Sequence, residues 1–321
     1  MAKIRLEPAD EFMHENTGEA NFNESMYFNF FDTGRRLGGF LRIGNRPNEG
    51  HAETTLCLYQ PDGSVLFQFK RAPIADNSAF AAGGMRFTVE KPFERLRVSY
   101  AGKACLLREP LAMADPRRAF QENPFVPVEL DLAIEGIGPM YGGEPTEAQR
   151  DAMTMEFARG HYEQHHRAVG RLAIDGAEHP VDGYGLRDHS WGPRSWQAPR
   201  SYRWLTANFG ADLGFMGSWI LRPDGVETRS GFVHRGRELV LVRDLRIDTD
   251  FVGAEQYHDR IRATLSCADG SQLAVEGRVL SLIPLRNRRN GHVTRISEGM
   301  TEWRCEGRVG YGLSEYLDQI A

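Results

Sequence analysis

The segment "DGYGLRDHSWGPRSW", Asp182 to Trp196, gathers ionisable side chains between two tryptophans. Within it, Asp188 and His189 are groups of the kind that transfer protons in enzymes. An apolar wall raises the pKa of a carboxylic acid, which then donates a proton at neutral pH. The same residues also permit a structural role, in which Arg187 or Arg194 pairs with Asp188 and the tryptophans cover the guanidinium. The residues alone leave both interpretations open.

A β-strand across this segment would separate its reactive groups, because successive side chains of a strand point to opposite faces. One face would carry Arg187, His189 and Trp191, and the other Asp188 and Ser190. Ser190 lies in "DHSWG", which resembles the nucleophile elbow of α/β hydrolases. However, an aspartate replaces the first glycine and the helices of that fold are missing. A hydrolase that uses Ser190 or His189 is therefore the less favoured alternative.

A second polar group occurs in "GHYEQHH", Gly160 to His166. His161 and His165 have the spacing of a zinc pair on a helix, but the glutamate stands at the wrong offset for an H-E-x-x-H motif. The residues that follow alternate like a strand, and on a strand His161, Glu163 and His165 share one face. A metal site, the lining of a polar cavity and a solvent-facing surface all fit this pattern.

Strand and turn signals dominate the chain. Alternating apolar runs flank Pro61–Gly63, a second Pro-Asp-Gly after Arg222, and Asp269–Gly270. Asp-Gly readily supplies the positive φ that hairpin turns need. We predict an all-β fold of the sandwich or barrel type.

Helical signals are few. "PTEAQRDAMTMEFARG", Pro145 to Gly160, begins and ends as a helix should, and "LSEYLDQIA" at the C-terminus is a second candidate. The first follows a glycine-rich stretch. We therefore place a domain boundary near residue 145, between β domains of residues 1–145 and 146–321.

The composition argues against several classes of function. The formal net charge of -5 does not suggest a nucleic-acid partner, and we expect the basic run Arg286–Arg295 to be a solvated hairpin tip. The four cysteines form no CxxC pair, and no P-loop or complete G-x-G-x-x-G is present. No signal peptide and no stretch of about 18 apolar residues occurs. We expect a cytoplasmic protein with no integral membrane segment, no metal and no other cofactor.

The order of these motifs resembles a known family. "HYEQH", "DGYGLRDHSWGPR", "SYRWLTANFG" and a late "EGRVGYGLSEY" are similar to segments of bacterial proteins related to carotenoid 1,2-hydratase, which include the AttH-like double-lipocalin (calycin-like) proteins. The resemblance is strongest from Gly160 to Phe209, and "RDHSWG" is its specific part. It implies two lipocalin-like antiparallel β-barrel or sandwich domains with a few short helices. It also implies hydration of an isoprenoid double bond without a cofactor.

The resemblance further implies roles for individual residues. An acid protonates the alkene, aromatic faces stabilise the resulting carbocation, and water captures it. Asp188 matches the family's acidic motif residue and is the first candidate for the acid, while His189 or Glu163 would activate the water. Trp191 and Tyr184 are candidates for the cation wall. The remaining expected residues are Arg187, with a structural role, and the substrate-binding Trp196, His165, Trp204 and Arg194.

The expected substrate is an apolar small molecule of the terpenoid, steroid or aromatic type. Hydration and dehydration share one transition state, so the direction of the reaction stays open, as does isomerisation. A non-enzymatic carrier of hydrophobic ligands is the main alternative, because lipocalin-like barrels commonly enclose such molecules. The sequence leaves the oligomeric state open, and a homodimer is one of the states it allows.

Overall fold

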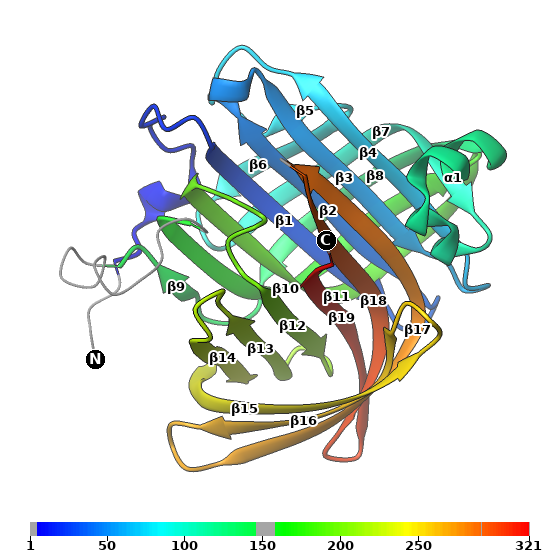
Figure 1. Ribbon diagram of the computed structural model, residues 1–321. Helices are drawn as coiled ribbons and strands as arrows, with labels where there is room; N and C mark the ends of the chain where they lie inside the picture. The colour runs from blue at the N-terminus through cyan, green and yellow to red at the C-terminus, as the bar shows by residue number, and fades with distance from the viewer. Residues whose placement is uncertain (1–4, 146–157, 290, 321) are drawn as a thin grey trace.

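The computed structural model describes residues 5–145, 158–289 and 291–320. Antiparallel strands make up nearly all of it, gathered into one large sheet and one closed barrel (Figure 1). The prediction of an all-β protein built from two barrel-like units is confirmed. Within the described ranges, no helix has the length and apolar character needed to cross a bilayer.

The first sheet has eleven strands and curls back on itself. Its spatial order is β4-β3-β2-β1-β11-β10-β8-β7-β6-β5, with β9 paired to β10 and an additional pairing of β4 with β7. The strands are β1 (Phe22–Asp32), β2 (Leu37–Arg46), β3 (His51–Tyr59), β4 (Val65–Pro73), β5 (Ala81–Ala82), β6 (Met85–Lys91), β7 (Arg95–Leu107), β8 (Phe125–Gly136), β9 (Tyr141–Gly143), β10 (Gly160–Ile174) and β11 (Ala177–Pro193).

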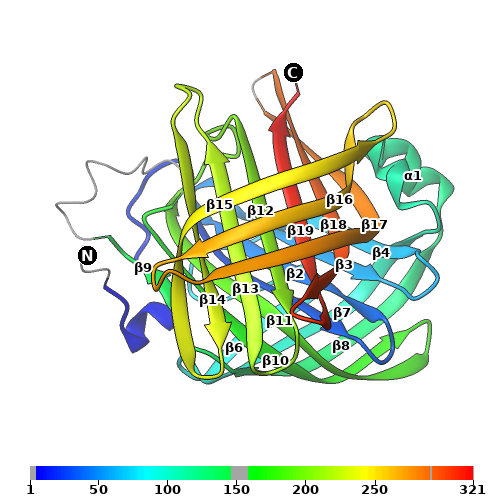
Figure 2. The same ribbon diagram turned by 90° about the horizontal axis from the view of Figure 1, so that it is seen from below.

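The second unit is a closed barrel in which each strand pairs with its neighbours in sequence, and the last pairs with the first. Figure 2 shows β15, β16 and β17 crossing in front of β12, β13 and β19. The strands are β12 (Ser201–Asn208), β13 (Leu213–Leu221), β14 (Glu227–Arg235), β15 (Glu238–Val252), β16 (Tyr257–Cys267), β17 (Gln272–Arg289), β18 (His292–Cys305) and β19 (Arg308–Gln319).

Asp-Gly turns connect several of these strands, as the sequence predicted. Gly63 joins β3 to β4 with a φ of 87°, and Gly270 joins β16 to β17 with a φ of 87°. Gly225 joins β13 to β14 with a φ of 85°. Glycine adopts this left-handed region without the steric cost of a Cβ atom, so these turns follow directly from the sequence.

The helices differ from those expected. The C-terminal helix prediction is wrong, because "LSEYLDQ" lies in β19 and pairs with both β12 and β18. Most of the predicted helix Pro145–Gly160 lies outside the described residues. Helix α1 (Pro116–Glu122), which the sequence analysis missed, begins at Asp115, whose side chain accepts a hydrogen bond from the backbone N–H of Arg118. The described residues also contain the 3-10 segments η1 (Pro8–Glu11), η2 (Pro47–Glu49) and η3 (Pro110–Ala114).

The two β units divide the chain at a different point from the predicted boundary at residue 145. Strands β10 and β11 follow that position, yet they pair with β8 and β1 of the first sheet. The change from sheet to barrel therefore falls between Pro193 and Ser201. Sheet membership depends on partners more than 150 residues away, which local turn and helix signals do not reveal.

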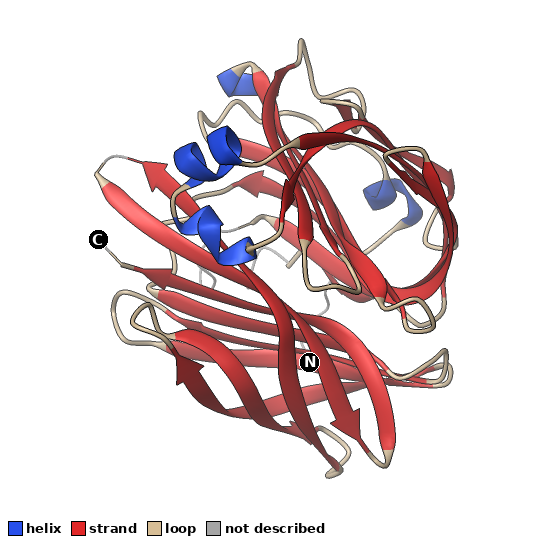
Figure 3. Cartoon of the chain, turned by 90° about the vertical axis from the view of Figure 1, so that its right-hand side faces the viewer, coloured by secondary structure: helices blue, strands red, loops and turns tan. Residues whose placement is uncertain are grey.

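Separate apolar cores fill the two units, and a third joins them. Figure 3 shows the two β units stacked one on the other. At the junction, Tyr27, Phe40 and Tyr59 of the first sheet pack with Met300 and Leu313 of the barrel. This apolar centre fixes the position of the polar groups around it.

Candidate active site at the junction of the two β units

Strand β11 divides the predicted motif between two faces of the first sheet. Asp188 faces the junction with the barrel, where it contacts His161, whereas Arg187 and His189 contact groups inside the curled sheet. The predicted alternation is confirmed. The structure therefore brings Asp188 and Glu163 together at the junction and separates them from His189.

A row of polar side chains crosses the first sheet at the junction. Glu163 of β10 is paired with Asp188 of β11, Asp188 with Tyr27 of β1, and Tyr27 with Arg42 of β2. His161, which shares a face with Glu163, places its Nε2 atom 3.7 Å from Oε1 of Glu163 and 3.7 Å from Oδ2 of Asp188. Strand register alone thus assembles an imidazole and two carboxyl groups.

A second row on the barrel faces the first. Trp204 of β12 is paired with Glu315 of β19, and Glu315 is paired with Glu298 of β18. The indole Nε1 of Trp204 donates a hydrogen bond of 3.0 Å to Oε1 of Glu163. The hydroxyl of Tyr59 donates one of 3.0 Å to the backbone carbonyl of Glu298. Both hydrogen bonds cross the junction and hold the two rows together.

Glu163 is the best placed proton donor of this group. Its side chain is 1% exposed. Burial, with help from the charge of Asp188, raises its pKa to about 7 against the opposing effects of His161 and Trp204. Its Oε2 atom has no hydrogen-bond partner among the described residues. A carboxyl group in this state is half protonated near neutral pH and has one buried oxygen that no described hydrogen bond occupies.

Asp188 and His161 connect this buried acid to solvent. The side chain of Asp188 is 19% exposed and that of His161 is 42% exposed. Burial disfavours the charged form of His161, but the nearby carboxylates of Asp188 and Glu163 outweigh this and raise its pKa. The pair is placed to accept a proton from water, which is the chemistry of a general base.

Two buried glutamates on the barrel side also have raised pKa values. Burial raises the pKa of both Glu298 and Glu315 to about 8, although Arg194 and Arg42 oppose the shift at Glu315. Both guanidinium groups lie over the indole ring of Trp196, with that of Arg194 4.8 Å and that of Arg42 5.5 Å from its centroid. The predicted pairing of tryptophan with arginine therefore occurs at Trp196.

Arg187 has a different partner from the one expected. Its Nη1 and Nη2 atoms donate hydrogen bonds of 2.7 and 2.9 Å to the two carboxylate oxygens of Glu11, and both side chains are fully buried. Gln164 Oε1 accepts two more hydrogen bonds from the same guanidinium. The structural interpretation of Arg187 fits these contacts, but the predicted ion pair of Arg187 with Asp188 is wrong because the two side chains leave opposite faces of β11.

His189 and Trp191 share the interior face with Arg187. The Nε2 atom of His189 lies 2.9 Å from Oε1 of Glu24, and its Nδ1 atom lies 3.1 Å from the hydroxyl of Tyr162. The indole of Trp191 stacks on the ring of His14 at a centroid distance of 3.9 Å. Neither His189 nor Trp191 reaches the junction, so neither supports the role that the resemblance implied there.

The remaining predicted residues occupy scattered positions. His165 is buried against Phe232 and His234 of β14, and burial together with the charges of His234 and His166 places its pKa well below the ordinary value. On strand β10, His161 and His165 stand roughly 13 Å apart, so they do not form the helical metal pair.

Tyr184 lies on the junction face of β11, half-buried and roughly 13 Å along the strand from Asp188. The hydroxyl of Ser190 accepts a hydrogen bond of 3.0 Å from Nη1 of Arg194, and His189 lies on the opposite face of the sheet. His161 is paired with Ser190 across β10 and β11, but its Nε2 atom lies beside Asp188 and Glu163, and no hydrogen bond joins His161 to Ser190 among the described residues.

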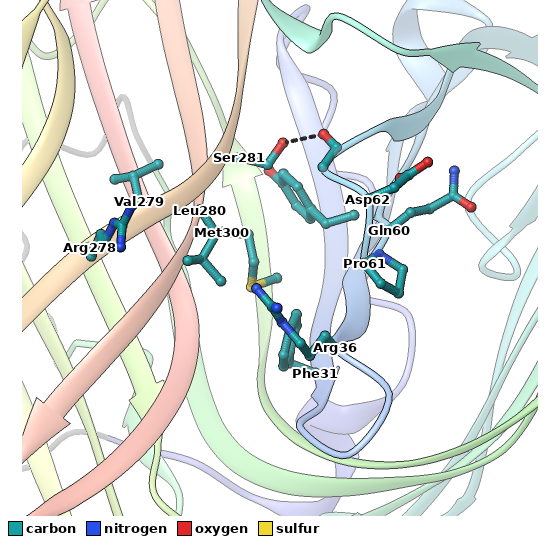
Figure 4. A pocket seen from close by; sticks show the side chains of 12 residues that line it. Phe31, Arg36, Gln60, Pro61, Asp62, Arg278, Val279, Leu280, Ser281 and Met300 are labelled. Atoms are coloured by element: carbon teal, nitrogen blue, oxygen red, sulfur yellow. Dashed lines mark hydrogen bonds between the residues drawn. The ribbon is translucent and has the colours of Figure 1, made fainter.

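A cavity of about 330 Å³ opens at the opposite side of the junction (Figure 4). Its lining includes Phe31, Arg36 and Tyr59 from the first sheet and Ser281 and Met300 from the barrel. Figure 4 shows the hydrogen bond of 3.1 Å that Ser281 donates to the carbonyl of Gly63 across this cavity. The cavity has the size of a small-molecule site.

Sequence reasoning missed the acidic groups that the barrel contributes. Glu298 in "ISEGM" and Glu315 in "LSEYL" each follow a serine between apolar residues, which is a weak signal for a buried polar position in a strand. Glu11 and Glu24 gave no motif at all. Their partners in β11 are more than 150 residues away, so only the fold reveals them.

The fold is that of a class of double-unit β proteins with solved members. A candidate AttH protein from Nitrosomonas europaea is similar with a TM-score of 0.60 and 14% identity, over 97% of this chain and 96% of that chain. CghA in complex with Sch210972 matches with a TM-score of 0.59 and 12% identity, over 93% and 89%. Kievitone hydratase from Nectria haematococca matches with a TM-score of 0.57 and 12% identity, over 95% and 93%.

These likenesses confirm the predicted AttH-like fold, while the relation to carotenoid 1,2-hydratase stays a prediction. The chain belongs to the family described as "Domain of unknown function (DUF7064)", whose model matches residues 7–320. A search of the curated proteins found no match.

Proposed function

We propose that the protein is a hydratase-like lyase that adds water to, or removes it from, an apolar small molecule held at the junction. The observation that carries this proposal is Glu163, a buried carboxyl group with a pKa of about 7 and one oxygen without a partner. Such a group is protonated often enough at neutral pH to act as a general acid.

The proposed reaction is balanced with these residues alone. The Glu163 carboxylic acid transfers its proton to one carbon of a double bond, which leaves a carbocation and the Glu163 carboxylate. Trp204 and Tyr27, whose rings lie 5.6 Å apart, provide aromatic faces that stabilise the cation. Water then bonds to the cationic carbon, and the Asp188–His161 pair accepts the proton that this water releases. Return of that proton to Glu163 completes the cycle, and the same steps in reverse eliminate water.

This assignment exchanges the roles that the resemblance implied. Asp188 was the first candidate for the acid and Glu163 a candidate for activating water. Asp188 is more exposed and lies beside His161 at the solvent side, whereas Glu163 is enclosed. Burial favours the protonated form of Glu163, whereas Asp188 lies beside His161 at the position from which a water molecule can be activated.

The name of one structural neighbour supports the same reaction class. Kievitone hydratase is described as a hydratase, and its fold matches this chain over nearly the full length of both. We extend only the reaction class from that likeness. The terpenoid, steroid or aromatic substrate, the cofactor-independent chemistry and the cytoplasmic location remain parts of the proposal that await measurement.

The variant Glu163→Gln tests the proposal. Purified protein and an apolar extract of the source cells are incubated in oxygen-18 water, and mass spectrometry records products that carry one labelled oxygen. We expect Glu163→Gln to lose this product while keeping its fold and any bound ligand. Glu178→Gln, which replaces an exposed glutamate at the start of β11, should behave like wild type. Full turnover by Glu163→Gln would remove Glu163 from the mechanism.

A carrier of apolar ligands is the second candidate, and the cavity of about 330 Å³ is the observation that favours it. A carrier would retain an extract compound in wild type, Glu163→Gln and Glu178→Gln alike, and no labelled product would form in any of them. The same experiment therefore separates the two functions.

A further inference from the structure

We propose that His14, Glu24 and His189 form a binding site for one divalent transition-metal ion, with Zn²⁺ as its probe. This site lies inside the curled first sheet, on the opposite face of β11 from Asp188. It is independent of the proposed function, because neither Glu163 nor His161 takes part in it.

The three side chains converge on a single point. Nδ1 of His14 lies 2.7 Å and Nε2 of His189 lies 2.9 Å from the same oxygen, Oε1 of Glu24. All of the ligand atoms lie within 4.8 Å of one another. Two imidazoles and one carboxylate are an established ligand set for Zn²⁺ and for Fe²⁺. Tetrahedral zinc holds its ligand atoms about 3.3 Å apart, so a small outward shift would admit the ion.

His189 and Glu24 are already held at their outer atoms by hydrogen bonds. The hydroxyl of Tyr162 lies 3.1 Å from Nδ1 of His189, and Oδ1 of Asp10 lies 3.5 Å from Nε2 of His14. The second oxygen of Glu24 accepts hydrogen bonds of 2.6 Å from Asn77 Nδ2 and 2.8 Å from the backbone N–H of His14. Partners of this kind orient metal ligands from behind in known metal sites.

The hydrogen bonds of this network are compatible with a cation at its centre. Tyr162 has one proton, and its hydroxyl lies 2.6 Å from Glu11 Oε1, so donation to Glu11 leaves the tyrosine oxygen as an acceptor for His189 Nδ1–H. A neutral His189 then presents a bare lone pair at Nε2. Nε2 of His14 has no hydrogen-bond partner among the described residues, and the tautomer that carries its proton there presents a lone pair at Nδ1.

Nδ1–H of His14 and Nε2–H of His189 can both donate to Oε1 of Glu24, which fills these contacts by hydrogen bonds. One divalent ion at the same point would take the place of these two protons, and the three ligand atoms would then bind it directly. It would also tie the segment before β1 to strands β1 and β11.

Metal stoichiometry tests the site directly. The full-length chain is stripped with a chelator, desalted, and titrated with Zn²⁺ while native mass spectrometry counts bound ions. We expect one retained zinc in wild type and in His161→Gln, which removes an imidazole from the opposite face of the sheet. We expect His14→Gln to lose it, and Tyr162→Phe to bind zinc about 10–100-fold more weakly because His189 loses its outer partner.

Cobalt provides a second measurement that needs no variant. Co²⁺ added to stripped wild type should give the intense visible bands of a tetrahedral nitrogen and oxygen site, and added Zn²⁺ should abolish them. Circular dichroism confirms that His14→Gln is folded; if it is not, the cobalt spectrum and the zinc count of wild type decide alone. Wild type that retains no zinc and gives no such bands would overturn the site. Loss of zinc in His161→Gln but not in His14→Gln would overturn it as well.

Discussion

Glu163 and Asp188 occupy directly paired positions of β10 and β11, so their carboxyl groups compete for negative charge. When two carboxyl groups share a site, one of them retains its proton to a higher pH than an isolated acid would. The more buried group retains its proton, because burial removes the water that stabilises its charged form. At this junction Glu163 is the enclosed member, and it is the group with the raised pKa.

The hydrogen bond from Trp204 tunes this acid. It stabilises the ionised form of Glu163, so removing it in Trp204→Phe should raise the pKa of Glu163. A general acid works only while protonated, so activity should fall as pH rises through about 7 in wild type. In the variant we expect activity to fall at a pH about one unit higher than in wild type. This is the pKa change that the loss of a hydrogen bond to a charged group produces.

Trp219→Phe is the control for that measurement. The indole of Trp219 also donates to a glutamate, Glu227, but on the exposed surface of the barrel. Its removal should leave the pH–rate profile unchanged. A fall in activity that moves equally along the pH axis in both variants, or that moves to lower pH in Trp204→Phe, would contradict the role of Trp204 at Glu163.

The alternation of side chains along β11 could be predicted from the sequence. Which of Glu163 and Asp188 retains its proton could not. The strand pattern of "GLRDHSW" correctly separated Asp188 from Arg187 and His189. Relative burial decides which carboxyl group keeps a proton, and it depends on Trp204 and the barrel that packs above. No local pattern in the segment contains that information.

Strands β10 and β11 are the elements on which both proposed sites depend. One face of the pair contributes Glu163 and Asp188 to the junction, and the other contributes Tyr162, Arg187 and His189 to the interior. The existence of these strands could be predicted from alternation, and their hairpin-like pairing follows from the turn between them. Their insertion beside β1 could not, because that pairing joins residues far apart in the chain.

The buried pair of Arg187 with Glu11 should stabilise this element strongly. Removing the guanidinium in Arg187→Met leaves an uncompensated carboxylate in the interior, and we expect a loss of about 3–5 kcal/mol in the free energy of unfolding. Arg167→Met is a matched control on the same strand pair. Arg167 makes an equally well-formed two-contact ion pair with Asp182, but in solvent, and should cost less than about 1 kcal/mol.

Urea unfolding followed by tryptophan fluorescence measures both costs. A difference of several kcal/mol between the two variants is expected, because geometry is similar and only burial differs. Equal costs would mean that the interior pair contributes no more than a surface one, and that Glu11 has another way to avoid an uncompensated charge.

The two units of the whole molecule meet through an apolar centre flanked by acids. The all-β class and several hairpins could be predicted from turns and alternation, whereas the meeting of Trp204, Glu298 and Glu315 with the first sheet could not. These residues lie on the outer surface of the barrel, where sequence patterns predict solvent. Packing against the first sheet converts them into a buried polar layer.

That layer predicts how stability depends on pH. The pKa of Glu298 and of Glu315 is raised from 4.5 to about 8 in the folded protein, mainly by burial. Below pH 4.5 both groups are protonated whether the chain is folded or not. Between pH 4.5 and 8 the unfolded chain releases these protons while the folded chain keeps them, so the free energy of unfolding falls as pH rises, on the order of 1 kcal/mol per pH unit for each group.

The double variant Glu298→Gln/Glu315→Gln should remove most of the slope that wild type shows between pH 7 and 8, because a glutamine has no proton to lose in either state. Below that window Glu163, with a pKa of about 7, adds to the slope, whereas the buried His165, His166 and His258, whose pKa values are lowered, oppose it below about 6.5. Glu276→Gln, an exposed position on β17, should keep the wild-type slope. Unfolding free energies that stay level or rise between pH 7 and 8 in wild type would mean that water or bound ions reach these carboxyl groups. The junction would then be open to solvent on the barrel side as well as at His161.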